Sequence, residues 1–309
     1  MKTISIFNQK GGVGKTTTVV NLATALSKLG KKILVIDFDP QANTTTGLGL
    51  DKSKVEKSIY KMFYEEDSFE NYIVKTEDGA YLIPSENALS GLEVELVSLD
   101  ERERLTMLSS IIKGIGDDFD LIIIDCPPSL GLLSLNALVA SDSIIIPIQT
   151  EYYALEGVSE LMNTYKSIKS SVKEDLEIEG VLLCMFDGRC KLSYEVVEEV
   201  KSYFKSKVFK TMIPRNIKLA EAPSYGKSVI VYDEKSKGAR AYLNLASELI
   251  ENIKKESKEK ENFKKKTKEK ISEESKDYNQ ELRKDEKDKK LQKDEEKNQV
   301  IRNDEKNIG

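Results

Sequence analysis

The sequence contains no histidine and no tryptophan, and only three of its 309 residues are cysteines. Without histidine, a Ser-His-Asp triad, a His-ligated metal and acid/base catalysis by an imidazole are excluded. The cysteines, Cys126, Cys184 and Cys190, form neither a CxxC pair nor a zinc-binding spacing. Any catalysis must therefore use lysine, carboxylate, hydroxyl and backbone groups.

Long apolar runs are also absent. The longest, at residues 121–124 and 143–148, are far shorter than the roughly 20 residues that a membrane-spanning helix needs. The N-terminus opens on a strand-like run, residues 2–8, instead of the basic and then apolar pattern of a secretory signal. The scattered cysteines fit a reducing compartment. We therefore expect a cytoplasmic protein without a membrane span.

Charge is distributed unevenly along the chain. Residues 254–309 contain 19 Lys and Arg against 16 Asp and Glu, a local net charge of +3, whereas residues 1–253 carry a net charge of −8. The apolar residues of the C-terminal segment are few and sustain no heptad repeat, so it cannot bury enough surface to fold alone. Its Lys/Glu pairs favour at most a transient helix. The predicted organisation is a folded domain over 1–253 and a charged, disordered or loosely helical tail over 254–309.

Within the predicted domain, short apolar runs alternate with longer segments of helical periodicity. The expected strands are residues 3–8, 32–37, 80–84, 121–125, 143–148, 178–184 and 208–211. The expected helices are residues 16–29, closed by Gly30, and 104–115, 132–140, 155–170, 193–205 and 239–253. This alternation predicts an α/β fold, a doubly wound and mostly parallel sheet with helices on both faces. Ligands bind such sheets at the carboxyl ends of the strands.

A glycine-rich loop follows the first predicted strand. Residues 9–17 read QKGGVGKTT and lead directly into a helix. In such a loop the backbone N–H groups can surround phosphate oxygens, Lys15 can reach the β- and γ-phosphates, and the Thr16 hydroxyl can bind Mg²⁺. The strict pattern GxxxxGK[ST] fails only because Gln9 occupies the place of its first glycine. The loop therefore predicts a nucleoside triphosphate site.

Two alternatives compete with this interpretation. The loop could be a plain turn between a strand and a helix, or it could bind a dinucleotide, with Asp37 at the end of the second strand contacting a ribose. The dinucleotide pattern GxGxxG is not matched, because Gly12 and Gly14 are followed by Thr17, and it has no use for Lys15.

The segment KGGVGKTT, residues 10–17, resembles the deviant Walker A box of the ParA/Soj partition ATPases, which are P-loop NTPases related to MinD. Further matches to this family lie at residues 37–41, 120–128, 185–189, 213–216 and 219–226, so the resemblance covers about residues 1–253. The chain starts at the phosphate-binding strand, as the short, chromosomal-type members do.

This resemblance implies an ATP and Mg²⁺ site. Lys10 is expected to reach the nucleotide of a second subunit, Asp39 to orient the attacking water, and Thr16 and Asp125 to hold Mg²⁺, Asp125 directly or through water. Asp37 is a further candidate for the water shell of Mg²⁺; helix capping or a turn is the alternative for all three aspartates. The implied catalytic residues are Lys10, Lys15 and Asp39, and the implied nucleotide-binding residues are Lys10, Gly11, Gly12, Val13, Gly14, Lys15, Thr16, Thr17, Pro214 and Asn216. Pro214 and Asn216 match the positions at which the family holds the adenine ring, so the resemblance implies ATP; a Pro-containing loop that closes the sheet is the alternative. The absence of a guanine-reading NKxD sequence supports ATP.

The resemblance also implies partners. ATP is expected to drive a sandwich homodimer that binds double-stranded DNA nonspecifically through Arg189 and Lys218, with Lys191, Lys210 and Lys227 as further candidates. A ParB-like protein is expected to stimulate a weak ATPase, in chromosome or plasmid segregation on the nucleoid. Because residues 1–253 are acidic overall, only a local basic patch could bind DNA, and each of these cations could equally be a solvated surface charge.

Two other functions stay open. A MinD-like ATPase positioned on a membrane surface would use the Lys-rich tail as an electrostatic anchor on anionic lipid, although the tail lacks the apolar face of an amphipathic membrane helix. A non-enzymatic ATP switch would bind a partner protein through the tail.

Overall fold

The computed structural model describes residues 1–151, 154–263 and 267, and the side chains of these residues except 154–156. The chain divides into two compact units, Met1–Leu249 and Ile250–Gly309. In the second unit the described residues are helical. The proposed roles of the tail concern residues that lie mostly outside the described part, so these roles and the boundary at residue 253 stay predictions.

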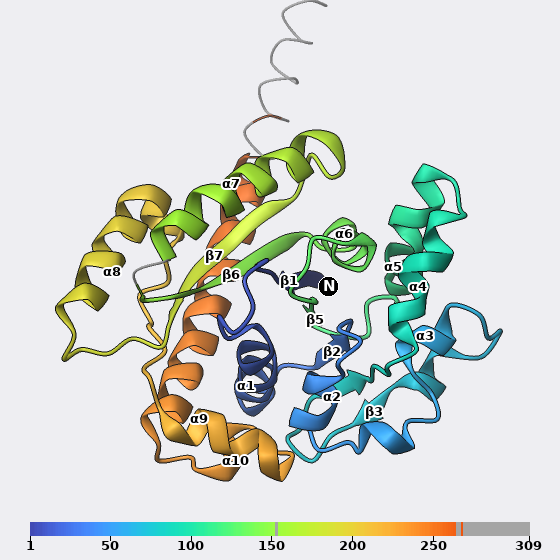
Figure 1. Ribbon diagram of the computed structural model, residues 1–309, viewed down its shortest axis with the longest axis horizontal. Helices are drawn as coiled ribbons and strands as arrows, with labels where there is room; N and C mark the ends of the chain where they lie inside the picture. The colour runs from blue at the N-terminus through green and yellow to red at the C-terminus, as the bar shows by residue number, and fades with distance from the viewer. Residues whose placement is uncertain (152–153, 264–266, 268–309) are drawn as a thin grey trace, which may run out of the picture. The chain divides into compact units, whose positions relative to one another are not determined.

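A seven-stranded sheet forms the centre of the first unit, with strand order β3-β4-β2-β5-β1-β6-β7. All neighbouring strands pair in parallel except β3 and β4, which are antiparallel. The predicted mostly parallel sheet is therefore confirmed (Figure 1). The strands are β1 (Lys2–Ile6), β2 (Ile33–Asp37), β3 (Val74–Lys75), β4 (Tyr81–Ile83), β5 (Leu121–Asp125), β6 (Ser143–Gln149) and β7 (Glu177–Cys184).

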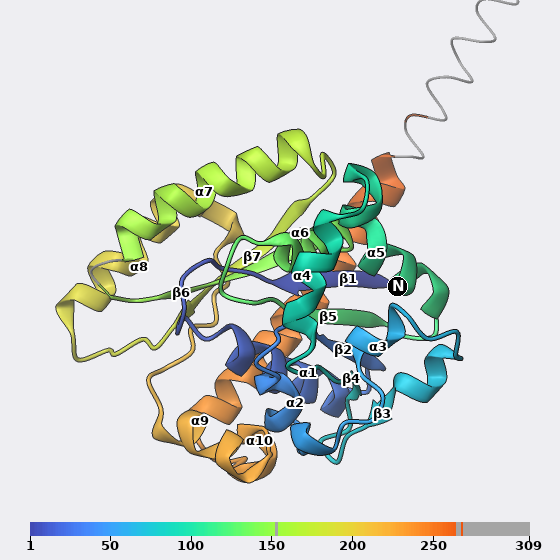
Figure 2. The same ribbon diagram turned by 45° about the vertical axis from the view of Figure 1, so that its right-hand side comes forward.

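Helices cover both faces of this sheet, as Figure 2 shows. α1 (Lys15–Lys28) lies on one face and contacts α10 (Val229–Tyr232). The other face carries α4 (Leu89–Val97), α5 (Glu101–Ile115), α6 (Leu132–Val139), α7 (Ala154–Ser171) and α8 (Lys191–Phe204). Residues 237–249 form a further helical segment. Because both faces are covered, the central strands are continuous apolar runs instead of alternating ones.

The main hydrophobic core lies between the sheet and the second layer of helices. Alternate strand residues such as Ile122 and Ile124 face it, since successive side chains of a strand point to opposite sides. Ile123 and Asp125 consequently share the opposite face, toward α1. This alternation places the last residue of β5, a carboxylate, beside the start of α1.

The first helix begins and ends where the glycines predict. It starts directly after Gly14, which has φ +99°. At its other end Gly30 has φ +80°, and the N–H groups of Gly30 and Lys31 bond to Ser27 and Leu26 carbonyl oxygens. Such a left-handed residue satisfies the last carbonyls of a helix.

One expected strand is wrong. Residues 208–211 form only an isolated bridge, Val208 to Val181, instead of a strand. The N–H groups of Lys210 and Thr211 donate to the Glu248 carboxylate, at 2.7 and 3.0 Å, and so are not available to a sheet ladder. The prediction also missed α4, the two-residue β3, and the short helices α2 (Asn43–Gly47), α3 (Ile59–Met62), α9 (Ile217–Glu221) and α10.

Candidate functional site

The glycine-rich loop connects β1 to α1 at the carboxyl edge of the sheet. Gly12 and Gly14 both have positive φ, and a Cβ built on Gly11 or Gly12 meets no atom within 4 Å. Residues with a side chain rarely adopt a positive φ, whereas glycine does so freely. The loop therefore presents open backbone at the N-terminus of α1, where N–H groups attract anions.

Lys15 is the first residue of α1 and is only 7% exposed. Its ammonium donates to the Lys10 carbonyl oxygen at 3.2 Å, so it lies over the loop. Burial lowers the pKa of Lys15, and the nearby Asp125 and Asp39 carboxylates oppose this shift. A cation is thus held beside the open backbone of the loop.

Asp125, at the end of β5, is completely buried. Its Oδ2 accepts hydrogen bonds from the hydroxyls of Thr16 at 2.8 Å and Thr44 at 2.7 Å. Within the described part of the chain its Oδ1 has no hydrogen-bond partner. A buried carboxylate oxygen without a donor is costly, which favours a cation at this position. Thr44 was missed by the sequence analysis, although its polar run, residues 43–46, begins only six positions after the end of the second strand.

Asp37 lies beside Asp125 because the two residues pair in register on β2 and β5. Its Oδ2 accepts from both the N–H and the hydroxyl of Thr45 at 2.7 Å, and its Oδ1 accepts from Asp39 N–H at 3.3 Å. Burial, and secondarily the Asp125 charge, raise the pKa of Asp37. Asp37 therefore organises the chain between β2 and α2.

Asp39 lines a cavity of about 240 Å³ together with the loop. Its Oδ1 accepts from Gln41 N–H at 2.9 Å, and the residue is 7% exposed. The cavity is lined by Gly11, Gly12, Gly14, Lys15, Thr16, Thr17, Asp39, Asn43, Pro128 and Met185. The structure thus brings Asp39, Lys15 and Thr16 around one space, and it adds Asn43 to the residues considered from the sequence.

A second, more apolar cavity of about 420 Å³ adjoins the loop through Gly14 and Thr17. Pro214 and Asn216 line it, with Tyr242 and Ile213 among the other lining residues. Asn216 also begins α9, where its Oδ1 accepts from Lys218 N–H at 2.9 Å. A flat, apolar ligand group fits such a cavity.

Met185 lines both cavities and connects them. Its φ of +55° is unusual for a residue with a side chain, and such strain collects at functional sites. Gln149, at the end of β6, donates from Nε2 to the Gly12 carbonyl oxygen at 2.7 Å and lies 3.2 Å from the Met185 sulfur. Gln149 thus ties the loop to the neighbouring strand.

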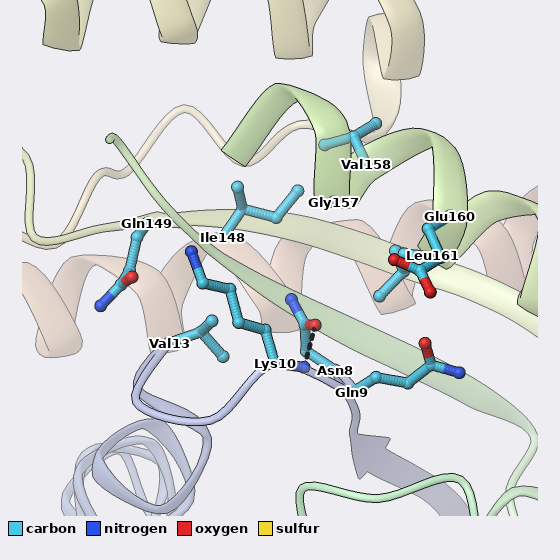
Figure 3. Close-up of a pocket in the computed structure, with 10 residues that line it drawn as sticks. All are labelled: Asn8, Gln9, Lys10, Val13, Ile148, Gln149, Gly157, Val158, Glu160 and Leu161. Atoms are coloured by element: carbon cyan, nitrogen blue, oxygen red, sulfur yellow. Dashed lines mark hydrogen bonds between the residues drawn. The ribbon is translucent and has the colours of Figure 1, made fainter. Parts of the chain in front are cut away.

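Lys10 lines a different cavity from Lys15. This cavity, about 320 Å³, lies between the loop and the start of α7 (Figure 3). The exposed Lys10 side chain extends from the loop toward Ile148 and Gln149. The loop backbone is held here by Asn8, whose side chain accepts from Lys10 N–H and donates to the Pro147 carbonyl oxygen.

Arg189, Arg215 and Lys218, which we call the basic cluster, lie on two adjoining segments after β7. Phe186 N–H bonds to the Ile213 carbonyl oxygen, and Arg215 N–H to that of Phe186, both at 3.0 Å. These bonds join the segments that carry Arg189 and Arg215, and Lys218 follows three residues after Arg215, in α9. Arg215 is an addition to the residues expected from the sequence. Lys191, Lys210 and Lys227 are all exposed.

Known proteins are similar to this chain over most of its length. Residues 1–178 match a family model described as "AAA domain". The sporulation initiation inhibitor protein Soj of Bacillus subtilis is 50% identical over 252 residues, 81% of this chain and 99% of Soj. The chromosome partitioning protein ParA of Myxococcus xanthus is 47% identical, over 80% of this chain and 87% of its own.

Solved structures are similar too. The structure of cobyrinic acid a,c-diamide synthase from Mycobacterium smegmatis with bound ADP and magnesium has a TM-score of 0.72 and 33% identity, and the match covers 82% of this chain and 95% of that one. In the described part of this chain, no helix has the length and apolarity to cross a membrane.

Proposed function

Because the chain belongs to the ParA/Soj family of chromosome partitioning ATPases, we propose that it binds ATP and Mg²⁺ at the glycine-rich loop and hydrolyses ATP weakly. In this proposal ATP drives homodimerisation, the dimer binds double-stranded DNA, and a ParB-like partner stimulates hydrolysis and release. The observation that supports it best is the meeting of Lys15, Thr16 and the buried Asp125 carboxylate at the N-terminus of α1.

The loop provides the phosphate contacts. Its open backbone at Gly11 and Gly12 and the positive end of α1 suit the phosphate oxygens, and Lys15 lies close enough to redirect its ammonium from the Lys10 carbonyl to a phosphate. Phosphoryl transfer needs little covalent help from the protein, so positioning and charge compensation supply most of the acceleration.

The residues present fit Mg²⁺. Mg²⁺ keeps several waters and uses one or two protein groups plus phosphates, so a single carboxylate with a hydroxyl is sufficient. The Thr16 hydroxyl would hold it together with Oδ1 of Asp125, which has no partner among the described residues, directly or through water. When bound, it would neutralise charge on the β- and γ-phosphates.

Asp39 is the proposed residue that orients the attacking water. Its carboxylate lines the same cavity as Lys15, and the bond from Gln41 N–H holds it in place. With no histidine in the chain, the orientation of the water falls to a carboxylate instead of an imidazole. A slow ATPase, dependent on a partner, is the expected consequence.

The apolar cavity at Pro214 and Asn216 suits the adenine ring. It adjoins the phosphate cavity through Met185, so a base and a triphosphate can occupy both at once. The apolar lining accepts the faces of the ring, and polar groups such as the Asn216 side chain can meet its edge.

Lys10 is the proposed link between two protomers. It is exposed and lines a different cavity from Lys15, so its ammonium is available to the nucleotide of a second copy. A second cation near the γ-phosphate offsets charge that builds up during transfer, as an arginine finger does. ATP would then fasten two identical faces together.

DNA binding is proposed for the basic cluster. Residues 1–253 carry a net charge of −8, so a local group of cations must supply the attraction to phosphates. Dimerisation would place two such clusters on one particle. Contacts to phosphates carry no sequence information, which makes the binding nonspecific.

The test is the mass and DNA retention of the purified chain with ATP, with ADP and without nucleotide, all with Mg²⁺. We expect the mass to double and DNA to be retained only with ATP. Lys10→Ala should bind ATP but keep the mass of one chain, whereas the matched control Lys113→Ala, an exposed lysine in the last turn of α5, should behave as the wild type. A single-chain mass under every condition would contradict the proposal.

A further inference from the structure

Each cation of the basic cluster is paired with a carboxylate of the same chain. Arg189 pairs with Asp187 at 2.7 Å, Arg215 with Glu151 at 2.7 Å, and Lys218 with Glu221 at 2.9 Å. The formal charge of these three pairs is therefore zero. A phosphate approaching the cluster meets three cations that are already engaged.

The pair of Arg189 and Asp187 has the most specific geometry. Arg189 Nε donates to Asp187 Oδ1 at 2.9 Å and Nη2 donates to Asp187 Oδ2 at 2.7 Å. The carboxylate therefore binds one edge of the guanidinium in a bidentate manner. Arg189 N–H also donates to Oδ1, at 3.1 Å. A phosphate binds a guanidinium through the same bidentate pair of hydrogen bonds. The carboxylate thus occupies a position in which a phosphate would bind.

Asp187 is also close to a second cation of the cluster. The hydrogen bonds from Arg189 lower the pKa of Asp187 most, and Arg215 contributes to the same shift. Asp187 is consequently fully charged at neutral pH, with Arg189 bonded to it and Arg215 near enough to act on its charge. Its removal would release Arg189, whereas Arg215 stays paired with Glu151.

The Asp187 carboxylate can nevertheless be replaced by another partner of Arg189. The Arg189 side chain is 89% exposed and that of Asp187 is 27% exposed. Exposed ion pairs contribute roughly 0–1 kcal/mol, because water screens them and ordering two side chains costs entropy. A phosphate can therefore displace the carboxylate, but with less net gain than it would obtain from an unpaired arginine.

We propose that Asp187 is an internal competitor for phosphate: it occupies the fork of Arg189 in the free chain and lowers the affinity of the basic cluster for duplex DNA. This inference rests on the proposed DNA binding. A cluster of paired cations binds weakly as one copy and becomes effective only when a dimer presents two.

The test compares Asp187→Asn with Asp175→Asn. Both substitutions remove one negative charge, but Asp175 precedes β7 and Asp187 follows it, so they lie at opposite ends of one strand. Asp175 is exposed and pairs with Lys173 at 3.7 Å. Retention of a nonspecific linear duplex is measured with ATP and Mg²⁺ at several salt concentrations. We expect Asp187→Asn to bind DNA about three-fold more tightly or better than Asp175→Asn, since one arginine is released to phosphate.

A second comparison tests whether the gain passes through Arg189. In an Arg189→Gln background, Asp187→Asn should bind DNA no more tightly than Asp175→Asn in the same background. Equal binding of Asp187→Asn and Asp175→Asn in the wild-type background would overturn the inference. So would weaker binding by Asp187→Asn, because Asp187 would then orient Arg189 for DNA.

Failure of the proposed function gives a separate result. If the wild-type chain binds a fluorescent ATP analogue and retains no DNA at low salt, DNA binding itself is refuted, and this inference with it. If the wild type retains DNA and only the two aspartate variants coincide, the role of Asp187 alone is refuted. Thermal unfolding of each variant shows whether it is folded.

Discussion

The nucleotide site and the basic cluster use charge in opposite ways. In the site, Lys15 and Asp125 are buried, and Asp125 is held by two hydroxyl donors. In the basic cluster, Arg189 is 89% exposed and its partner is its near neighbour in sequence. Removing one buried charge leaves its neighbours without compensation, so a single substitution there has a large effect. Each exposed charge contributes little binding energy alone, so an effect on DNA binding comes from the sum of several such charges.

The largest expected effect therefore lies in the nucleotide site. Lys15→Ala should weaken ATP binding by about 4 kcal/mol, roughly a thousand-fold, since it removes a cation from a partly desolvated phosphate site. Lys28→Ala, in the last turn of the same helix, is the matched control and should bind ATP as the wild type does. Titration with a fluorescent ATP analogue measures both. If Lys15→Ala still bound ATP tightly, charges in the nucleotide site would be no more indispensable than those in the basic cluster.

The sequence was most informative about this same region. Continuous apolar runs predicted β1, β2, β5 and β6 closely, because strands buried on both faces need such runs. The loop at residues 9–17 was recognised because its glycines, Lys15 and Thr16 are all local in sequence. The places of Asp39 and Asp125 then followed from the rule that parallel strands end at one edge of the sheet.

The rest depended on contacts between residues distant in sequence. The Glu248 carboxylate, almost forty positions away in the sequence, accepts hydrogen bonds from the N–H groups of Lys210 and Thr211. The expected strand at 208–211 therefore does not form. The two residues of β3 are both exposed and leave no apolar pattern. Thr44 lies in α2, which follows the left-handed Ala42, and its hydroxyl bonds to Asp125, 81 positions away in the sequence. None of these contacts has a local signal.

The next largest effect concerns hydrolysis. Asp39→Ala should lower phosphate release about a hundred-fold, because the attacking water loses the carboxylate that orients it. ATP should still bind, since Asp39 does not belong to the loop, and ATP-bound dimers should accumulate. Phosphate release and mass at saturating ATP are the two measurements. Hydrolysis at the wild-type rate would exclude Asp39 from water positioning.

A further effect, spread over several pH units, concerns folding stability without nucleotide or Mg²⁺. Burial raises the pKa of Asp37, so the folded chain keeps a proton that the unfolded chain releases above about pH 4. The unfolding free energy should fall as the pH rises from there through neutrality, by at most about 1.4 kcal/mol per pH unit for each such proton. Asp37→Asn should reduce this slope.

Urea unfolding between pH 5 and pH 8 measures the slope. Burial also raises the pKa of Asp125, so Asp37→Asn should reduce the slope without abolishing it. Asp175→Asn, which removes an exposed carboxylate, is the control and should leave the slope as in the wild type. Parallel curves for all three chains would mean that burial does not set the charge state of Asp37.

The smallest expected effect lies in the basic cluster. Arg189→Gln should weaken DNA binding only a few-fold and lower the slope of log affinity against log salt by about one, because one phosphate contact is lost among several. Arg102→Gln, which removes an exposed arginine from the first turn of α5, controls for the change in net charge.

DNA retention with ATP over a range of salt gives both quantities. The mass of Arg189→Gln with ATP is measured in parallel, because loss of the dimer would assign Arg189 to the protomer interface instead of DNA. A thousand-fold loss of DNA binding would also contradict the additive behaviour, since it would make Arg189 as indispensable as Lys15. A few-fold loss, with the dimer intact, would mean that the switch depends on how many exposed cations ATP brings together.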